Sequence, residues 1–249
     1  MRARARIALA ALLAALPAWG GGPAAAACAP MEHDGHRHVV CTVTAGQDVR
    51  LWLRDGDGRV WGGFDRLEAA LAARGERLVF AMNAGMYHAD RAPVGLFIGE
   101  GGTEGRVVTA AGPGNFGMLP NGVFCVHEDG FAVVESRRFA DNPPDCVGAS
   151  QSGPMLVIEG AVHPRFIPGS PSRFVRNGVG VSADGTTAHF VISDRPISFH
   201  DFAGLFRDAL ETPQALYFDG NVSRLHAPGL ARSDRGRQLG PLVGLVVAD

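Results

Sequence analysis

The sequence predicts an α+β fold, a hairpin-rich mixed β-sheet with two main helices. Apolar runs of strand length outnumber amphipathic segments of helix length, and consecutive runs are separated by Gly-containing turns such as Asp129-Gly130 and Asp184-Gly185. Strands joined by such tight turns pair as antiparallel neighbours, whereas a doubly wound parallel sheet needs a helix between strands. No Pro- or Ser-rich linker interrupts the pattern, so a single domain is expected.

The first 27 residues have the pattern of a signal peptide. Three arginines precede the apolar run 7–16, and small residues at 24–27 offer cleavage sites. The mature domain is then predicted to be residues 28–249, in the periplasm or outside the cell. A lipoprotein anchored through Cys28 is an alternative that the sequence disfavours, because the residue three positions earlier is Ala and not a large aliphatic.

Two segments have the periodicity of amphipathic helices. The first begins at a predicted Asp65 N-cap, with Glu68 three positions later as a capping box, and ends at a glycine. The second covers residues 199–210, with Ser198 or Asp201 as alternative N-caps. Strands are expected at residues 39–44, 49–54, 78–82, 94–98, 107–108, 122–126, 131–134, 155–158, 161–163, 179–181, 188–192, 215–218 and 242–247.

Four cysteines in a chain predicted to be exported indicate two disulfides. Four cysteines allow three pairings, of which the local one, Cys28 with Cys41 and Cys125 with Cys146, is preferred. A cysteine metal site is not expected, because no C-x-x-C pair is present.

No cofactor is predicted from the sequence. Three histidines gather at His33, His36 and His38, where a metal site and a solvated turn at a frayed terminus are the two readings; the turn is preferred. Ca²⁺ held by Asp and backbone carbonyls is a further alternative, with no loop signature to support it.

Composition and motifs exclude several classes of function. The chain has no lysine, which rules out a Walker A site and a Schiff-base enzyme, and its net charge of −2 argues against nucleic-acid binding. Residues 112–117 match G-x-G-x-x-G, but Pro113 lies inside the motif and a strand follows instead of a helix, so dinucleotide binding is not expected. No apolar run after the signal segment is long enough to span a bilayer.

Short polar segments, most of them containing glycine, follow or precede several of the predicted strands. They lie at residues 83–85, 151–154, 173–178, 193–194 and 219–224. Each contains a side chain able to bind a hydroxyl or an anion. Asp219 is the strongest candidate, because a buried strand would deliver its carboxylate to a sheet end beside the flexible Gly220; a plain Asp-Gly turn is the alternative.

Together these segments resemble the phosphodiester glycosidase family, in particular its exported bacterial branch. The segments that carry the resemblance are MNAGMY with PVGL, GPGNF with PNGVF, QSGPMLV, RNGVGV, ISDRPISFHDFAGLFRD and ALYFDGNVS, in this order over most of residues 39–247. The resemblance implies a mixed-sheet α+β fold with the site at one end. The chain departs from the glycine run of the animal enzyme at Asn221 and Val222.

The activity implied is hydrolysis of a sugar-1-phosphodiester between the anomeric carbon and the phosphate oxygen, with a glycan or sugar phosphate as substrate. Asp219 is expected to act as base or nucleophile and Arg176 to hold the phosphate. Asp194 and His88 are weaker candidates for a second acid or base. The remaining expected substrate contacts are Asn83, Gly85, Ser152, Gly153, Asn177, Gly220 and Ser223.

Two other functions are consistent with the same residues. One is a non-catalytic periplasmic protein that binds polysaccharide or cell-wall glycan. The other is a hydrolase of a different phosphodiester, such as a teichoic-acid-like or lipid-linked glycan.

Overall fold

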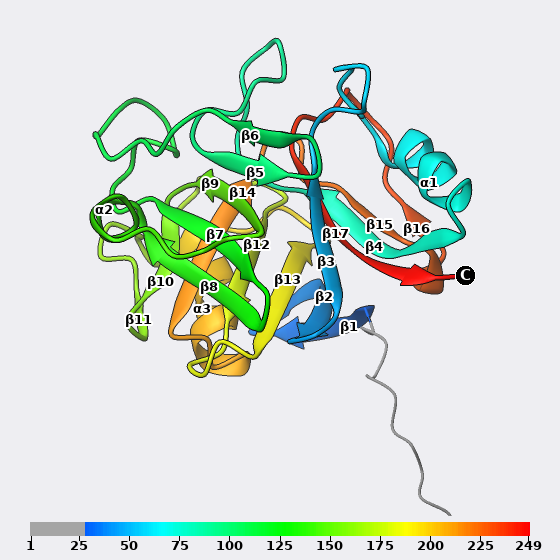
Figure 1. Ribbon diagram of the computed structural model, residues 1–249. Helices are drawn as coiled ribbons and strands as arrows, with labels where there is room; N and C mark the ends of the chain where they lie inside the picture. Colours follow the sequence, from blue (N-terminus) through cyan, green and yellow to red (C-terminus); the bar gives the residue numbers. More distant parts are fainter. Residues whose placement is uncertain (1–27) are drawn as a thin grey trace, which may run out of the picture.

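Three antiparallel β-sheets surround one core in the computed structural model, which describes residues 28–249 (Figure 1). The sheet orders are β1-β2-β13-β12-β14-β10-β11, β16-β15-β4-β17-β3 and β6-β5-β9-β7-β8. Every pair of neighbouring strands in residues 28–249 is antiparallel, so the predicted mixed sheet is wrong in this respect. The chain is α+β but mostly β. The predicted signal peptide lies outside the described residues.

The elements are β1 Cys28–His33, β2 His36–Thr44, β3 Asp48–Trp52, α1 Phe64–Ala72, β4 Glu76–Asn83, β5 Phe97–Gly99, β6 Gly102–Glu104, β7 Gly122–His127, β8 Gly130–Glu135, α2 Ser136–Asp141, β9 Gly148–Ser152, β10 Met155–Ile158, β11 Ala161–Val162, β12 Asn177–Val181, β13 Thr187–Ser193, α3 Phe199–Gly204, the π-helical turn η1 Leu205–Ala209, β14 Gln214–Asp219, β15 Leu225–Ala227, the 3₁₀ turn η2 Pro228–Leu230, β16 Arg232–Ser233 and β17 Leu242–Ala248.

An aromatic cluster joins the three sheets at the centre of the core. Phe190 of β13 lies 5.3 Å from Phe80 of β4 and 5.4 Å from Phe124 of β7, and Phe124 also meets Phe218 of β14 at 6.3 Å. All four rings are fully buried. Burying each contributes about 2–3 kcal/mol, so these contacts fix the sheets relative to one another and place the end of β14 next to the end of β4.

The helices cover the outer faces of two sheets. α3 lies against the seven-stranded sheet, and α1 lies against the sheet that contains β4 (Figure 1). Apolar side chains of α3 and η1, including Phe202 and Phe206, pack on the first sheet, and Leu67 and Leu71 of α1 pack on the second. The predicted second helix is confirmed as α3 followed by η1.

The predicted caps have different outcomes. Ser198 Oγ accepts a hydrogen bond from Asp201 N, which decides between the two caps considered for α3. The predicted Asp65 capping box is wrong: the N-cap of α1 lies two residues earlier, at Gly63, and no side chain caps the helix. The short helix α2 was not anticipated.

The Gly-containing turns predicted the hairpins correctly. The β7–β8, β10–β11 and β12–β13 pairs form as expected. The expected strand at 107–108 is absent, because β5 pairs with residues 102–104 instead. The turn preferred for the histidine segment is present at Asp34 and Gly35, between His33 and His36, but the terminus is not frayed. It forms β1, which pairs with β2 along its whole length.

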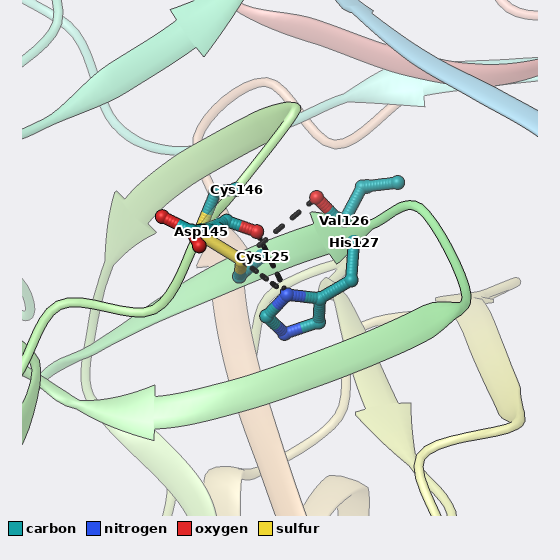
Figure 2. The surroundings of a disulfide bond; sticks show 5 residues. All are labelled: Cys125, Val126, His127, Asp145 and Cys146. Carbon is teal, nitrogen blue, oxygen red and sulfur yellow. Dashed lines mark hydrogen bonds between the residues drawn. A yellow bond between two sulfur atoms is a disulfide. The ribbon is translucent and has the colours of Figure 1, made fainter.

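Both preferred disulfides form. Cys28–Cys41 links β1 to β2, and Cys125–Cys146 ties β7 to the loop before β9 (Figure 2). Beside the second disulfide, His127 Nδ1 lies 2.9 Å from the carbonyl oxygen of Asp145. The Cys28 sulfur is bonded to Cys41 in this structure, so the same sulfur is not free to carry a lipid. No helix within residues 28–249 combines the length and apolarity needed to cross a membrane.

Candidate active site

A cavity of about 890 Å³ opens at the end of β14, where the loop 219–224 faces the segments 87–91 and 235–238. Asp219 is its only lining carboxylate within the described chain, and Gly220 and Ser223 line it as well. The structure therefore brings together three of the predicted site residues, all from the Asp-Gly segment that follows a buried strand.

The Asp219 carboxylate is fixed by its own loop. Its Oδ1 accepts hydrogen bonds from Gly220 N at 2.5 Å and Asn221 N at 2.7 Å. Burial raises the pKa of Asp219, and the backbone N–H groups of Asn221 and Gly220 partly offset the shift. A carboxylate with a raised pKa beside a cavity is suited to accept a proton.

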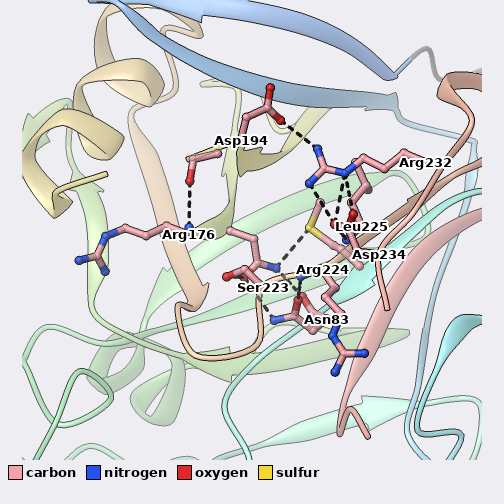
Figure 3. A network of polar contacts seen from close by, with 11 residues as sticks. Asn83, Arg176, Asp194, Ser223, Arg224, Leu225, Arg232 and Asp234 are labelled. Atoms are coloured by element: carbon pink, nitrogen blue, oxygen red, sulfur yellow. Dashed lines mark hydrogen bonds and ion pairs between the residues drawn. The ribbon is translucent and has the colours of Figure 1, made fainter. Parts of the chain in front are cut away.

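Four arginines line the same cavity: Arg91, Arg224, Arg235 and Arg237. Arg224 is the most buried of the four, with 8% of its surface exposed, and burial lowers its pKa. Its guanidinium makes no hydrogen bond or ion pair with any residue of the described chain, and its buried Nη2 has no partner (Figure 3). Four cations around one carboxylate make the cavity strongly attractive to an anion.

Two buried asparagines hold the loop that carries Asp219. Asn177 Oδ1 accepts hydrogen bonds from the amide of Asp219 and from Ser223 Oγ, both at 3.2 Å. Asn83 Oδ1 accepts from Arg224 N at 2.9 Å (Figure 3), and the two asparagines bond to each other. Because both side chains are fully buried and bonded within the protein, they position the loop, instead of lining the cavity as expected from the sequence.

The predicted contacts on β9 and its neighbours are also buried residues that bond or pack within the protein near the site. Ser152 is fully buried and its Oγ donates to the carbonyl of Phe218 at 2.8 Å, one residue before Asp219. Gly85 N donates to Ser150 Oγ at 3.0 Å. A Cβ at Gly153 would lie 2.6 Å from Asn121 Cβ. None of these three predicted residues lines the cavity.

Arg176 lies on the opposite side of the seven-stranded sheet from the asparagine pair. Its guanidinium stacks 3.6 Å above the Phe199 ring, Nε donates to the carbonyl of Ile197, Nη2 donates to that of Ser172, and the buried Nη1 has no partner. Burial lowers the pKa of Arg176, and the nearby Tyr217 partly offsets this. The side chain points away from the Asp219 loop and does not line the cavity (Figure 3).

The two weaker acid–base candidates lie outside the cavity. Asp194 is exposed and pairs with Arg232 at 3.0 Å, as the close-up also shows (Figure 3). His88 is exposed in the turn of the 83–97 segment, where its backbone N–H bonds to Ala92 O. Among the described residues no group of three or more His, Cys, Asp or Glu side chains is arranged to hold a metal ion.

Several lining residues were not assigned from the sequence. Tyr87 is one; burial raises its pKa, and Asp219 adds to the shift. Arg91, Arg235 and Arg237 lie on irregular segments, where no periodicity marks a functional side chain. Arg224 directly follows the DGNVS segment, and this position was the one available signal.

Comparisons with known proteins point to one family. A sequence model of the phosphodiester glycosidase family matches residues 76–230, which include Asp219 and Arg224. Uncharacterized protein YigE of Escherichia coli K12 is 35% identical over 181 residues, covering 73% of this chain and 70% of YigE. The zebrafish N-acetylglucosamine-1-phosphodiester alpha-N-acetylglucosaminidase catalytic domain, auto-inhibited by pro-peptide, has a TM-score of 0.58 at 14% identity, over 88% of this chain and 81% of that domain. At this identity the likeness concerns the fold.

Proposed function

The chain belongs to the phosphodiester glycosidase family, and on this premise we propose that it is an exported hydrolase of sugar-1-phosphodiesters. The bond cleaved is the one between the anomeric carbon and the phosphate oxygen. The observation that carries the proposal is that one carboxylate, Asp219, and four arginines line the same cavity. A glycosyl phosphodiester needs both: a carboxylate near the anomeric carbon and cations on the phosphate.

Arg224 is the best placed of the four arginines to bind the phosphate. Its buried guanidinium is free of protein partners, so an anionic oxygen would supply the bonds that it lacks. Arg176 was first expected in this role, but its Nε and Nη2 donate to carbonyls on the far side of the sheet. In the proposal Arg176 is a positioning residue that orders the start of β12.

Asp219 acts on the sugar side of the scissile bond. The bond from the anomeric carbon to the phosphate oxygen breaks, and its electron pair leaves on the phosphate as a monoester anion. In a direct displacement a water oxygen bonds to the anomeric carbon as that bond breaks, and one proton of the water passes to the Asp219 carboxylate. If Asp219 first bonds to the anomeric carbon as an ester, water then breaks that ester bond, and one proton of the water passes to the released carboxylate. The leaving phosphate needs little protonation, which agrees with a cavity lined by one carboxylate. Gly220 and Ser223 lie beside Asp219 and are the proposed contacts for sugar hydroxyls.

Export is part of the proposal and rests on two features. The first 27 residues have the composition of a signal peptide. The two disulfides are typical of proteins that fold in an oxidising compartment. A periplasmic or secreted protein would meet cell-wall and exported glycans there.

A matched pair of substitutions tests the proposal. Asp219→Asn keeps the shape of the side chain but removes the base, and we expect kcat for release of free sugar to fall by about 10³-fold. Asp194→Asn removes an exposed carboxylate outside the cavity and should retain activity within about twofold. The assay uses purified residues 28–249 and a panel of sugar-1-phosphodiesters. Full activity of Asp219→Asn would refute the catalytic assignment.

The non-catalytic alternative makes a different prediction for the same panel. A glycan-binding protein would release no sugar from any substrate, yet would bind sugar phosphates with similar affinity before and after Asp219→Asn. Absence of sugar release from every substrate, together with binding measured by isothermal titration, would favour the binding protein.

A further inference from the structure

A second cavity, of about 560 Å³, adjoins the first. The two share Arg224, Arg235, Gly236 and Gln238 as lining residues, so they form one continuous depression with Arg224 and Arg235 at the junction. The proposed function accounts only for the cavity that contains Asp219. Its neighbour is lined by Trp61, by residues 62–66 and by Ser233 and Asp234.

The N-terminus of α1 opens into this second cavity. Gly62, Gly63, Phe64 and Asp65 line it, and the Gly63 N-cap carries no side chain that could accept a hydrogen bond from the first turn. Uncapped N–H groups at a helix start, together with the helix dipole, favour a bound anion. α1 has nine residues, so two full turns lie behind this end.

The charges around the second cavity point the same way. Arg224 lines this cavity, is 8% exposed as a residue and has a buried Nη2 without a hydrogen-bond partner among the described residues. Arg235 has no ion-pair partner among residues 28–249. Asp234 is already occupied by Arg232 and by the amide of Leu225, and Asp65 is exposed at the rim. Arg66 is paired with Asp55, so the free positive charge comes from the two arginines at the junction.

We propose that the second cavity binds a further phosphate on the leaving-group side of the substrate. Arg224 borders both cavities, so the scissile phosphate would lie at their junction, with the sugar on the Asp219 side and the leaving alcohol directed toward α1. The substrate class is then a phosphodiester whose leaving alcohol is itself phosphorylated, as in a chain of repeating sugar-phosphate units. This inference rests on the proposed function for the direction of the substrate.

A substitution at Gly63 can place a carboxylate of the protein itself at the proposed phosphate position. Its φ of −177° is extended backbone open to any residue, and no atom lies within 4 Å of a Cβ added there. Gly63→Asp places a carboxylate where it can cap the first turn of α1, which competes with a bound phosphate. Gly229→Asp adds the same carboxylate at an exposed position that lines neither cavity, with no atom within 4 Å of the added Cβ, and is the matched control.

The kinetic test compares two substrates with the same sugar, one with glycerol and one with glycerol 3-phosphate as the leaving alcohol. We expect the wild-type kcat/KM to favour the phosphorylated substrate by about tenfold at low ionic strength. The ratio should fall toward one in Gly63→Asp and remain near the wild-type value in Gly229→Asp. A wild-type ratio near one, or equal ratios in wild type and Gly63→Asp, would overturn the subsite and leave the proposed function standing.

A binding measurement decides the subsite even if no substrate is cleaved. Isothermal titration with inorganic phosphate should show two sites in the wild type and in Gly229→Asp, and one site in Gly63→Asp. Identical isotherms for wild type and Gly63→Asp would refute the second phosphate position. Absence of cleavage with these expected isotherms would refute the hydrolase but support the anion subsite. Melting temperatures of all three proteins verify that each is folded.

Discussion

Two arginines near the end of β14 show opposite uses of a buried guanidinium. Arg176 lies under α3, stacked on Phe199, with Nε and Nη2 donating to backbone carbonyls. Arg224 lies between two cavities, and its guanidinium makes no hydrogen bond or ion pair within the described chain. Both are more than nine-tenths buried, and burial lowers the pKa of both.

The difference teaches that burial alone does not identify a ligand-binding arginine. A guanidinium that stacks on rings and meets carbonyls serves the packing of the protein, because its charge is already partly compensated. One that faces a cavity without partners has a hydrogen-bonding capacity that only water or a ligand can use. Substrate binding and catalysis are therefore expected on the cavity side of the loop. The contacts of Arg176 on the α3 side are expected to stabilise the fold.

The largest expected effect concerns activity on the cavity side. Arg224→Ala should lower kcat/KM for sugar-1-phosphodiesters by about 10²–10³-fold, because it removes a charged donor from the phosphate. Thermal unfolding should change little, since the guanidinium has no protein partner to lose. Arg224→Lys should recover part of the activity by restoring the charge without the planar fork. An unchanged kcat/KM in Arg224→Ala would refute the assignment of Arg224 as the phosphate-binding residue.

The next effect concerns stability on the α3 side. Arg176→Ala should lower the free energy of unfolding by about 3 kcal/mol, because it leaves a void beside Phe199 and two carbonyls without donors. Urea titration measures the change. Arg176→Lys, which keeps the charge but loses the stacking plane, should be intermediate and should turn over substrate when folded. A folded Arg176→Lys protein that has lost all activity would instead support the original expectation that Arg176 holds the phosphate.

The smallest effect is the pH dependence of the Asp219 carboxylate. Its pKa is raised above the ordinary value of 3.8, so kcat/KM should decline as the pH falls through that raised value and the base becomes protonated. The same shift means that the folded state binds the proton more readily than the unfolded state, and stability is lost as the pH rises through this window.

Asp219→Asn removes this pH-dependent cost. The variant should therefore melt slightly above the wild type at neutral pH, and the difference should disappear below pH 3.8. Calorimetry over a series of pH values measures both curves. A wild type that is the more stable at neutral pH would show that the backbone hydrogen bonds to Oδ1 outweigh the burial of the charge.

The sequence alone predicts one part of the contrast between Arg176 and Arg224, namely that Arg176 and its neighbour Asn177 lie on opposite faces of the sheet. Arg176 and Asn177 are adjacent at the start of a strand, and adjacent side chains of a strand point to opposite faces of the sheet. The two residues could not both face one cleft, and the structure places Asn177 toward Asn83 and Arg176 toward Phe199. Alternation alone does not tell which face has the cavity, because that depends on what covers each face.

Local chemistry determined the hairpins, the two disulfides, the two main helices and the approach of Asp219 at a strand end. Glycines specify tight turns, and cysteines close along the chain pair locally, so both act over short separations. The family segments can be recognised directly as sequence patterns. The same patterns could not give the sheet order, because β4 pairs with β15 and β17 across long loops.

The sequence by itself determined that a carboxylate would follow a buried strand in a phosphodiester glycosidase domain. Only the tertiary structure decided which arginine stands beside that carboxylate. Arg224 reaches the cavity because its amide bonds to Asn83, 141 residues earlier, and Asn177 holds the amide of Asp219. Such contacts join segments that have no common periodicity, so they exist only after the three sheets have packed around the core.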